Sequence, residues 1–200
     1  MKIALIRPNS SMVACPPPIG LGYLAGYLKE RRNDQILIID ARRFRLSIDE
    51  IIFQLKDFAP DIVGISALSC EAEPSHLLAE KSKKHLGSIP IVIGGPYATS
   101  LGKEILSDKN IDFVVIGEGE ESFFELVKTL EQNGDLNEVL GIAFRQKGAP
   151  FFTGQRPPIA NIDSLKIEWE GLKPESYFSS TLRTSENTLR RSARMLPILT

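Results

Sequence analysis

Short apolar runs alternate along the chain with longer segments whose apolar positions recur at helical spacing. The runs have the length of strands and cover residues 3–6, 36–40, 61–68, 89–95 and 112–119. They are continuous and do not alternate with polar residues, which is typical of strands buried on both faces of a parallel sheet. The segments between them predict helices at 19–32, 47–59, 74–86, 100–107 and 120–132. This order predicts an α/β fold with a doubly wound, flavodoxin-like (Rossmann-like) parallel five-stranded sheet in the strand order 2-1-3-4-5.

The first predicted helix has an apolar face and a glycine face. Leu21, Leu24 and Leu28 recur at the spacing of one buried face. Gly22 and Gly26 lie on the opposite side. Since glycine has no side chain, we expect that another element could approach the helix closely there.

The pattern changes after the fifth helix. Residues 141–154, GIAFRQKGAPFFTG, predict a C-terminal β-hairpin extension that turns at Lys147-Gly148 and lengthens the sheet at one edge. Core periodicity is absent from residue 155 onward. We therefore expect one α/β domain at 1–154 and a linker at 155–200. The last residues, 195–200, are apolar and strand-like, which suggests a chain that continues into a further domain.

Charge and cysteine content exclude several classes of protein. With 24 basic and 25 acidic residues, the chain has no excess charge that would attract nucleic acid or an anionic membrane. No apolar run approaches the ~20 residues that a membrane-spanning helix needs. The two cysteines, Cys15 and Cys70, form neither a disulfide framework nor a CxxC motif. We expect thiols in a reducing compartment, and hence a cytoplasmic protein.

Glycines and small residues gather where the predicted strands end. The third strand ends in Ser66-Ala67-Leu68-Ser69-Cys70, the fourth in Gly94-Gly95-Pro96-Tyr97 and the fifth in Gly117-Glu118-Gly119-Glu120. Ligands of open α/β sheets bind at this carboxyl edge, and glycines let the backbone approach a bulky ligand. Tight strand-to-helix turns would also explain them. The acids Glu120 and Glu121 begin a helix, where its dipole favours negative charge.

Three other functions can be weighed at this edge. A dinucleotide-binding NAD(P) oxidoreductase domain would use Gly20, Gly22 and Gly26 with Asp40, but 13 residues separate the first strand from Gly20 where the fingerprint needs an immediate turn. A cap on the segment before Arg42 and Arg43 is the alternative role for Asp40. A phospho-receiver needs acids at the ends of strands one and three, where this chain has arginine and serine. A cofactor-free interaction module stays open.

The motifs at the strand ends resemble the cobalamin-binding fold of the methionine synthase and methylmalonyl-CoA mutase type. That family has an SxL after strand three, matched by Ser66-Ala67-Leu68, and a GG after strand four, matched by Gly94-Gly95. Its DxHxxG loop after strand one is missing here. No histidine occurs in residues 8–19, and the sequence has PPPIGLGYLAGYL at 16–28 instead.

This replacement resembles the N-terminal domain of cobalamin-dependent radical S-adenosylmethionine (SAM) enzymes. Further matching stretches are PDIVGISALS, IPIVIGGPYAT, DFVVIGEGEESFFELV and IANIDSL followed by EWEGLKPESYF. The resemblance implies a cobalamin (vitamin B12) module that presents (methyl)cobalamin to a radical SAM domain of the same full-length chain, for methyl transfer or a related radical reaction. SAM and the [4Fe–4S] iron–sulfur cluster would be bound only by that absent C-terminal domain, so we expect this fragment alone to be inactive. The substrate is unknown.

The resemblance and the carboxyl edge together give a set of candidate cofactor-binding residues and no catalytic or metal-ligating residue. The set is Pro8, Asn9, Ser66, Leu68, Ser69, Gly94, Gly95, Pro96, Tyr97, Gly117, Glu118 and Gly119. Ser66 would hydrogen-bond the nucleotide tail of cobalamin. Tyr97 would pack along the corrin or the tail, and a half-buried loop aromatic is an equally good interpretation of this residue.

The loop at 7–19 bears on how cobalt is ligated. Three prolines at 16–18 stiffen it, so we expect it to form a preformed floor under the corrin. Because the loop has no imidazole, we expect base-off cobalamin without a protein histidine ligand. The alternatives are His76, the one histidine placed near this edge, and a thiolate from Cys15 or Cys70.

Overall fold

The protein is described by a computed structural model that covers residues 1–10, 16–177, 179–183 and 189–193, with side chains described as far as residue 177. Its main sheet has seven strands in the order β2-β1-β3-β4-β5-β6-β7. The first five are parallel and run in the predicted order. Their bounds are β1 (Lys2–Arg7), β2 (Gln35–Asp40), β3 (Ile62–Ser66), β4 (Ile91–Gly94) and β5 (Phe113–Val115). The doubly wound, flavodoxin-like prediction is thus confirmed.

The predicted hairpin extends this sheet at the β5 edge. Strand β6 (Ile142–Gln146) pairs antiparallel with β5, and β7 (Ala149–Phe152) pairs antiparallel with β6. Lys147 and Gly148 lie between the two strands with φ angles of 51° and 84°, so the turn is left-handed at both residues, as a two-residue hairpin turn requires. The hairpin and its turn are confirmed.

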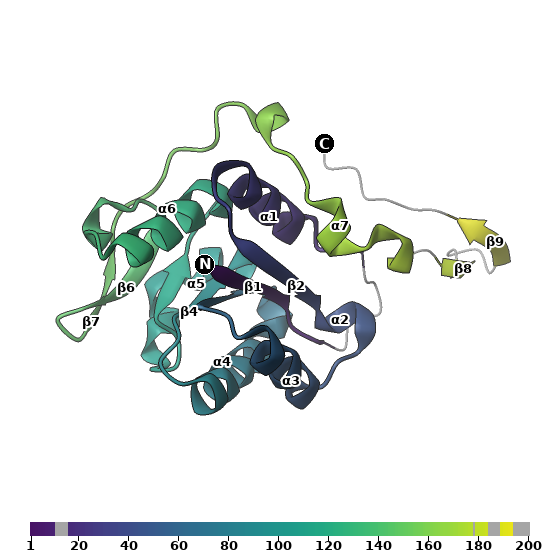
Figure 1. Cartoon of the computed structure of the whole chain (residues 1–200), viewed down its shortest axis with the longest axis horizontal. Coiled ribbons are helices and arrows are strands. Elements are labelled where there is room, and N and C mark those ends of the chain that lie inside the picture. The colour runs from purple at the N-terminus through teal and green to yellow at the C-terminus, as the bar shows by residue number, and fades with distance from the viewer. Residues whose placement is uncertain (11–15, 178, 184–188, 194–200) are drawn as a thin grey trace.

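Helices cover both faces of the sheet (Figure 1). One face is packed by α1 (Ile19–Arg31) and α6 (Gly119–Gln132), and the other by α3 (Ile48–Phe58), α4 (Ala72–Leu86) and α5 (Gly95–Leu101). A capping box between Ser47 and Glu50 begins α3, which satisfies backbone donors that would otherwise lack partners. Two separate apolar cores result, one on each face. No helix in the described part of the chain is long and apolar enough to cross a membrane.

The helical segment predicted at roughly 100–107 is confirmed, but it begins earlier and is divided in two. Helix α5 begins directly after β4, at Gly95, and the chain then continues as the 3₁₀-helix η2 (Gly102–Ser107). Gly102 has a φ of 58°, which an α-helix cannot accommodate, so the helix ends there. Strands β3 and β4 are also shorter than their apolar runs, because the chain leaves the sheet at Ala67 and at Gly95 to begin η1 (Ser69–Glu71) and α5.

Residues 155–177, called the strap here, pack against the domain although they lack core periodicity. The strap carries η4 (Ile162–Ser164), α7 (Trp169–Leu172) and η5 (Pro174–Tyr177). It passes from the α6 side over α1 to the β2 edge (Figure 1). The strap is followed by the β8 (Ser179–Arg183) and β9 (Leu189–Ala193) pair. The strand-like residues 195–200 lie outside the described residues.

The strap contacts the glycine face of α1. The backbone N–H of Glu168 donates to the carbonyl oxygen of Gly22 at 3.0 Å. A Cβ atom on Gly22 would lie 2.5 Å from Leu172 Cδ1, and one on Gly26 only 1.9 Å from the carbonyl oxygen of Lys166. The expectation that Gly22 and Gly26 allow another element to approach closely is therefore confirmed.

Candidate functional site

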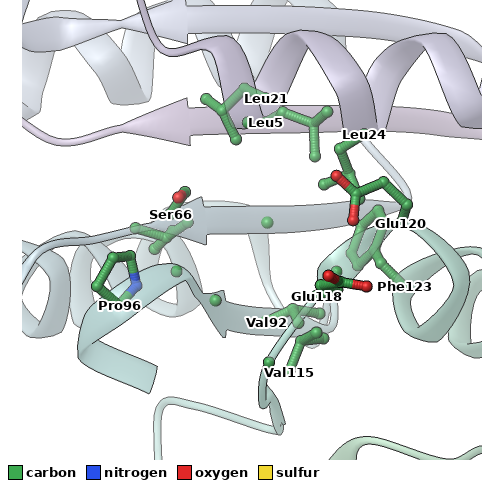
Figure 2. A pocket seen from close by; sticks show the side chains of 17 residues that line it. Leu5, Leu21, Leu24, Ser66, Val92, Pro96, Val115, Glu118, Glu120 and Phe123 are labelled. Atoms are coloured by element: carbon green, nitrogen blue, oxygen red, sulfur yellow. The ribbon is translucent and has the colours of Figure 1, made fainter. Parts of the chain in front are cut away.

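A cavity of about 280 Å³ opens at the carboxyl edge of the sheet, between the strands and helices α1 and α6. We call it the slot. Figure 2 shows Ser66 and Pro96 at one side of it and Glu118 and Glu120 at another. Its volume is near the lower end of the ~300–1,000 Å³ of small-molecule sites. The predicted site residues that line it are Ser66, Gly94, Gly95, Pro96, Gly117, Glu118 and Gly119.

Missing side chains keep the slot open. Cβ atoms added to Gly20 or Gly117 would meet no other atom within 4 Å, and one on Gly94 would only reach Val115, at 4.0 Å. The opposite wall is apolar and comes from Leu24 of α1 and Phe123 of α6, among other residues. The slot therefore suits a mostly apolar ligand group held close to backbone.

Gly95, like Gly117 with its φ of 86°, has a backbone that favours glycine, and Gly95 is also crowded. Its φ is 84°, and a Cβ atom there would lie 2.9 Å from both the carbonyl oxygen of Ala67 and the hydroxyl oxygen of Ser66. Both the left-handed backbone and the crowding exclude a side chain. Gly95 thus makes the tight turn from β4 into α5, whereas Gly94, in extended backbone, leaves open space.

A second cavity of about 240 Å³, called the loop cavity, adjoins the slot. The two share four lining residues: Gly20, Leu21, Ser66 and Pro96. The loop cavity is also lined by Pro16 and Pro18 of the first loop, by Leu68 after β3 and by the charged side chains of Arg7, Arg42 and Glu71. Leu68 thus reaches the site, and one ligand could occupy both cavities.

The first loop is fastened to the sheet by Arg7. Arg7 and Asp40 are register partners at the ends of β1 and β2, and Arg7 Nε donates to Asp40 Oδ1 at 2.9 Å. Arg7 Nη1 donates to the carbonyl oxygen of Pro16 at 2.7 Å. Asp40 also accepts from the backbone N–H of Arg43 at 3.1 Å, and so caps α2 (Ala41–Phe44) as anticipated. Asp40 is 4% exposed, so it is not available as a ribose-binding acid.

Tyr97 lies in the core on the other face of the sheet. Its hydroxyl is 2.8 Å from Nε2 of His76, whose Nδ1 is 2.6 Å from Oδ2 of Asp108. Burial raises the pKa of Tyr97. Burial alone would raise the pKa of Asp108, but hydrogen bonds from His76 and Asn110 outweigh it and the pKa is lowered. Neither Tyr97 nor His76 lines the slot or the loop cavity.

Pro8, Asn9 and Ser69 also do not line either cavity. Asn9 Nδ2 donates to the carbonyl oxygen of Leu46 at 3.3 Å, and Ser69 is exposed at the start of η1. Cys70 is exposed beside it, whereas Cys15 lies outside the described residues. No group of three or more His, Cys, Asp or Glu side chains that could hold a metal ion occurs among the residues that the structure describes.

Glu120 is a slot residue that the sequence assigned to the helix dipole. It lines the slot beside Leu24 and Phe123 (Figure 2). Burial raises the pKa of its carboxyl group, and the nearby carboxylates of Glu118 and Glu121 raise it further. Glu118 itself accepts a hydrogen bond from the backbone N–H of Ile159 in the strap at 2.7 Å. The sequence did not identify Leu24 and Phe123 as the apolar wall of the slot, because each lies at the helical spacing of core residues.

Residues 9–127 match the B12 binding domain family. The match covers more than half of the chain, and the chain belongs to this family. The slot lies at the carboxyl edge of the sheet, where open α/β sheets bind their ligands.

Relatives and solved structures extend the comparison. An uncharacterised methyltransferase of Pyrococcus horikoshii is 33% identical over 187 residues, which are 90% of this chain and 40% of that protein. The anaerobic magnesium-protoporphyrin IX monomethyl ester cyclase of Rubrivivax gelatinosus is 30% identical over 187 residues, 88% of this chain and 34% of that protein. The cobalamin-dependent S-adenosylmethionine radical enzyme OxsB, with aqua-cobalamin and S-adenosylmethionine bound, has the same fold, with a TM-score of 0.72 at 20% identity over 88% of this chain and 25% of that one.

The chain is therefore a B12-binding domain similar to those of cobalamin-dependent radical SAM enzymes, and the resemblance seen in the sequence is confirmed. It spans two fifths or less of the length of the proteins compared above.

Proposed function

We propose that this chain binds cobalamin at the carboxyl edge of its sheet and presents it to a radical SAM domain. The observation that carries the proposal is the slot, a glycine-lined opening between the sheet and the apolar sides of α1 and α6. Its shape suits the nucleotide tail, which ends in a flat aromatic base. The corrin would then cover the carboxyl edge and the adjoining loop cavity.

The residues of the slot would contribute to binding in different ways. Gly94 and Gly117 leave room along β4 and β5, and Ser66 offers a hydroxyl group from the end of β3. Leu24 and Phe123 supply the apolar wall. When bound, cobalamin supplies the methyl-transfer or radical chemistry, and the protein supplies binding and orientation.

We further propose that the cofactor is held base-off and without a protein imidazole below cobalt. Two observations support this. Nδ1 of His76 is in contact with Asp108 and Nε2 with Tyr97, so both ring nitrogens already have partners. The described part of the first loop is held to the sheet by the hydrogen bond from Arg7 to Pro16. Electron paramagnetic resonance of the cob(II)alamin-loaded protein tests it. We expect no nitrogen superhyperfine splitting from an axial ligand, and observing that splitting would contradict the proposal.

The full-length protein is proposed to continue into a radical SAM domain, which would bind SAM and a [4Fe–4S] cluster. The support is that the related proteins are more than twice as long as this chain. In this proposal residues 1–154 form the cobalamin domain, residues 155–200 lead toward its partner domain, and the isolated chain is catalytically inactive. The relatives include a methyltransferase and a cyclase, so the substrate is not assigned.

Retention of a corrin by the purified chain tests the central proposal. The chain is mixed with hydroxocobalamin and desalted, and its visible spectrum is recorded. We expect stoichiometric corrin absorbance. A spectrum without corrin would contradict cobalamin binding. Enhanced NAD(P)H fluorescence in that case would indicate a dinucleotide domain, and the absence of both signals would indicate an interaction module.

A further inference from the structure

Glu120 is the acid of the slot whose carboxyl group has no side-chain partner in the described structure. The neighbouring acids do have partners. Glu118 accepts from the backbone N–H of Ile159 at 2.7 Å, and Glu121 forms an ion pair with Arg156 at 3.2 Å. Within the described part of the chain, the donors that act on Glu120 are backbone N–H groups at the start of its own helix. Its carboxyl group therefore has hydrogen-bonding capacity that a ligand in the slot can use.

The Glu120 carboxyl group is accessible from the slot and lies on its apolar side. Figure 2 shows it turned toward the cavity, beside Leu24 and Phe123. Glu120 is only partly buried, so a group that enters the slot can contact it. The strands contribute only apolar residues, glycines and Ser66 to the slot, and α1 contributes only apolar residues and glycine. The charged groups of the slot are thus the carboxyl groups of Glu118 and Glu120.

These charges indicate which part of the cofactor tail meets Glu120. The phosphate of the tail is anionic, and no basic residue lines the slot in the described structure, so Glu118 and Glu120 would repel it. The base is apolar apart from its ring nitrogens, and it therefore suits the wall that Leu24 and Phe123 make. In base-off cobalamin one ring nitrogen is released from cobalt and becomes a free acceptor. Burying that acceptor without a donor is unfavourable.

The surroundings of Glu120 favour a carboxyl group that can donate. Burial raises the pKa of this group, and the carboxylates of Glu118 and Glu121 raise it further, while backbone N–H groups at the helix start oppose them. Arg156 is the cation that the strap brings to this end of α6, and it pairs with Glu121 and Glu125. A protonated carboxyl group has one O–H donor, which is what a free ring nitrogen needs.

We propose that the Glu120 carboxyl group binds the free ring nitrogen of the nucleotide base, with one proton held between them. This rests on the proposed function, since it takes base-off cobalamin as the ligand and the slot as the place of its tail. The carboxyl O–H donates to the nitrogen, or the protonated nitrogen donates to the carboxylate, and the complex holds one proton in both cases. Glu120 therefore selects cofactors whose base has a free ring nitrogen.

Two cobamides test this contact. Methylcobalamin has the ring nitrogen. Methyl-p-cresolylcobamide has the same corrin, phosphate and ribose, but its phenolic base has no nitrogen. Dissociation constants are measured in the dark by equilibrium dialysis, with the corrin absorbance as the readout. We expect Glu120→Leu to raise the constant for methylcobalamin by about tenfold, as the loss of one hydrogen bond gives. The constant for the p-cresolyl cobamide should not rise.

The pH profile of binding distinguishes this contact from a structural role. Above the pKa of Glu120 in the unliganded protein, binding takes up one proton, so the dissociation constant for methylcobalamin should rise by up to about tenfold per pH unit. The amide of Glu120→Gln donates without taking up a proton, so its constant should not change between pH 7 and pH 8. An equal slope in the parent and in Glu120→Gln would overturn the shared proton.

Glu125→Gln is the matched control. Glu125 lies on the same helix and also pairs with Arg156, but it does not line the slot. This variant should keep both dissociation constants and the pH slope of the parent. If Glu120→Leu does not fold, as judged by circular dichroism, the pH profile of Glu120→Gln decides the question.

The outcomes separate this inference from the proposed function. If the parent retains neither cobamide, the proposed function fails. If the parent binds both and Glu120→Leu binds both equally tightly, the inference fails and the function stands. If Glu120→Leu weakens the binding of both cobamides by the same factor, Glu120 contacts the ribose or another group that they share, which overturns the assignment to the ring nitrogen.

Discussion

The hydroxyl group of Tyr177 donates a hydrogen bond to Oδ2 of Asp40, across 137 residues of sequence. The same carboxylate pairs with Arg7, which also donates to the carbonyl oxygen of Pro16. One buried carboxylate therefore joins the end of the strap to the carboxyl edge and to the first loop. The end of the strap is thus connected through this group to Arg7, which lines the loop cavity.

Removing the Tyr177 hydroxyl should weaken this link. We expect Tyr177→Phe to lower the free energy of unfolding by about 1.5 kcal/mol, the contribution of a hydrogen bond to a charged group. Urea unfolding followed by circular dichroism measures it. Tyr23→Phe is the control, because in the described structure the Tyr23 hydroxyl makes no hydrogen bond. Equal effects of the two substitutions would show that the Tyr177–Asp40 bond has no role in stability.

The contact between the strap and α1 gives a second prediction. Alanine normally stabilises a helix relative to glycine by about 1 kcal/mol. At Gly26 the added Cβ would lie 1.9 Å from the carbonyl oxygen of Lys166, so we expect Gly26→Ala to destabilise by about 2 kcal/mol. Trypsin should also cleave the strap faster after Lys166 and Lys173. Gly20→Ala, in the same helix with nothing within 4 Å, should instead stabilise by up to about 1 kcal/mol and leave cleavage unchanged, and matching behaviour of both variants would refute the contact.

The sequence predicted the sheet well because its signal is local. Continuous apolar runs and the hairpin turn at Lys147-Gly148 are determined within a few residues. The packing of the strap has no such signal: Ile167 and Leu172 follow no period, and they contact Gly22, about 145 residues earlier in the chain.

The sequence predicted those slot residues whose place depends on the position of the backbone. It did not predict correctly the residues whose place depends on the direction of the side chain. Glycines at the strand ends line the slot as expected. Tyr97 does not, because α5 begins at Gly95 and turns the Tyr97 side chain into the core on the other face. Arg42 and Glu71 could not be paired from the sequence, since helix α3 and strand β3 lie between them in the chain.

Glu120 predicts a pH dependence of stability. Burial and the neighbouring acids raise the pKa of its carboxyl group in the folded state, so the folded protein binds this proton more tightly than the unfolded chain does. Its contribution to stability is then complete below the ordinary glutamate pKa of ~4.3 and is lost as the pH rises through the raised pKa. Glutamine resembles the protonated form. We expect Glu120→Gln to be more stable than the parent at pH 7 and equally stable near pH 4, measured by urea unfolding; a gain of the same size at both pH values would contradict this.

Substitutions at the two adjacent glycines should separate binding from folding. Gly94→Val places a side chain in open space next to extended backbone, so we expect an unchanged melting temperature and at least tenfold weaker cobalamin binding. Gly95→Val should instead lower the melting temperature, because of its φ of 84° and the close oxygens of Ala67 and Ser66. Ser66→Leu should also weaken binding, since it fills the slot and removes a hydroxyl group. If Gly94→Val and Ser66→Leu both bind cobalamin as tightly as the parent, the nucleotide tail of the cofactor does not lie in the slot.

The strap over α1 also affects how the domain is completed during synthesis. Helix α1 is made early, but its glycine face is contacted by residues 166–172, which are made much later. A ribosome must therefore extend the chain well past the β7 strand before this first helix gains its outer cover. Until then the N-terminal helix has one exposed face, so a nascent chain halted after the hairpin would lack a contact that the finished domain has.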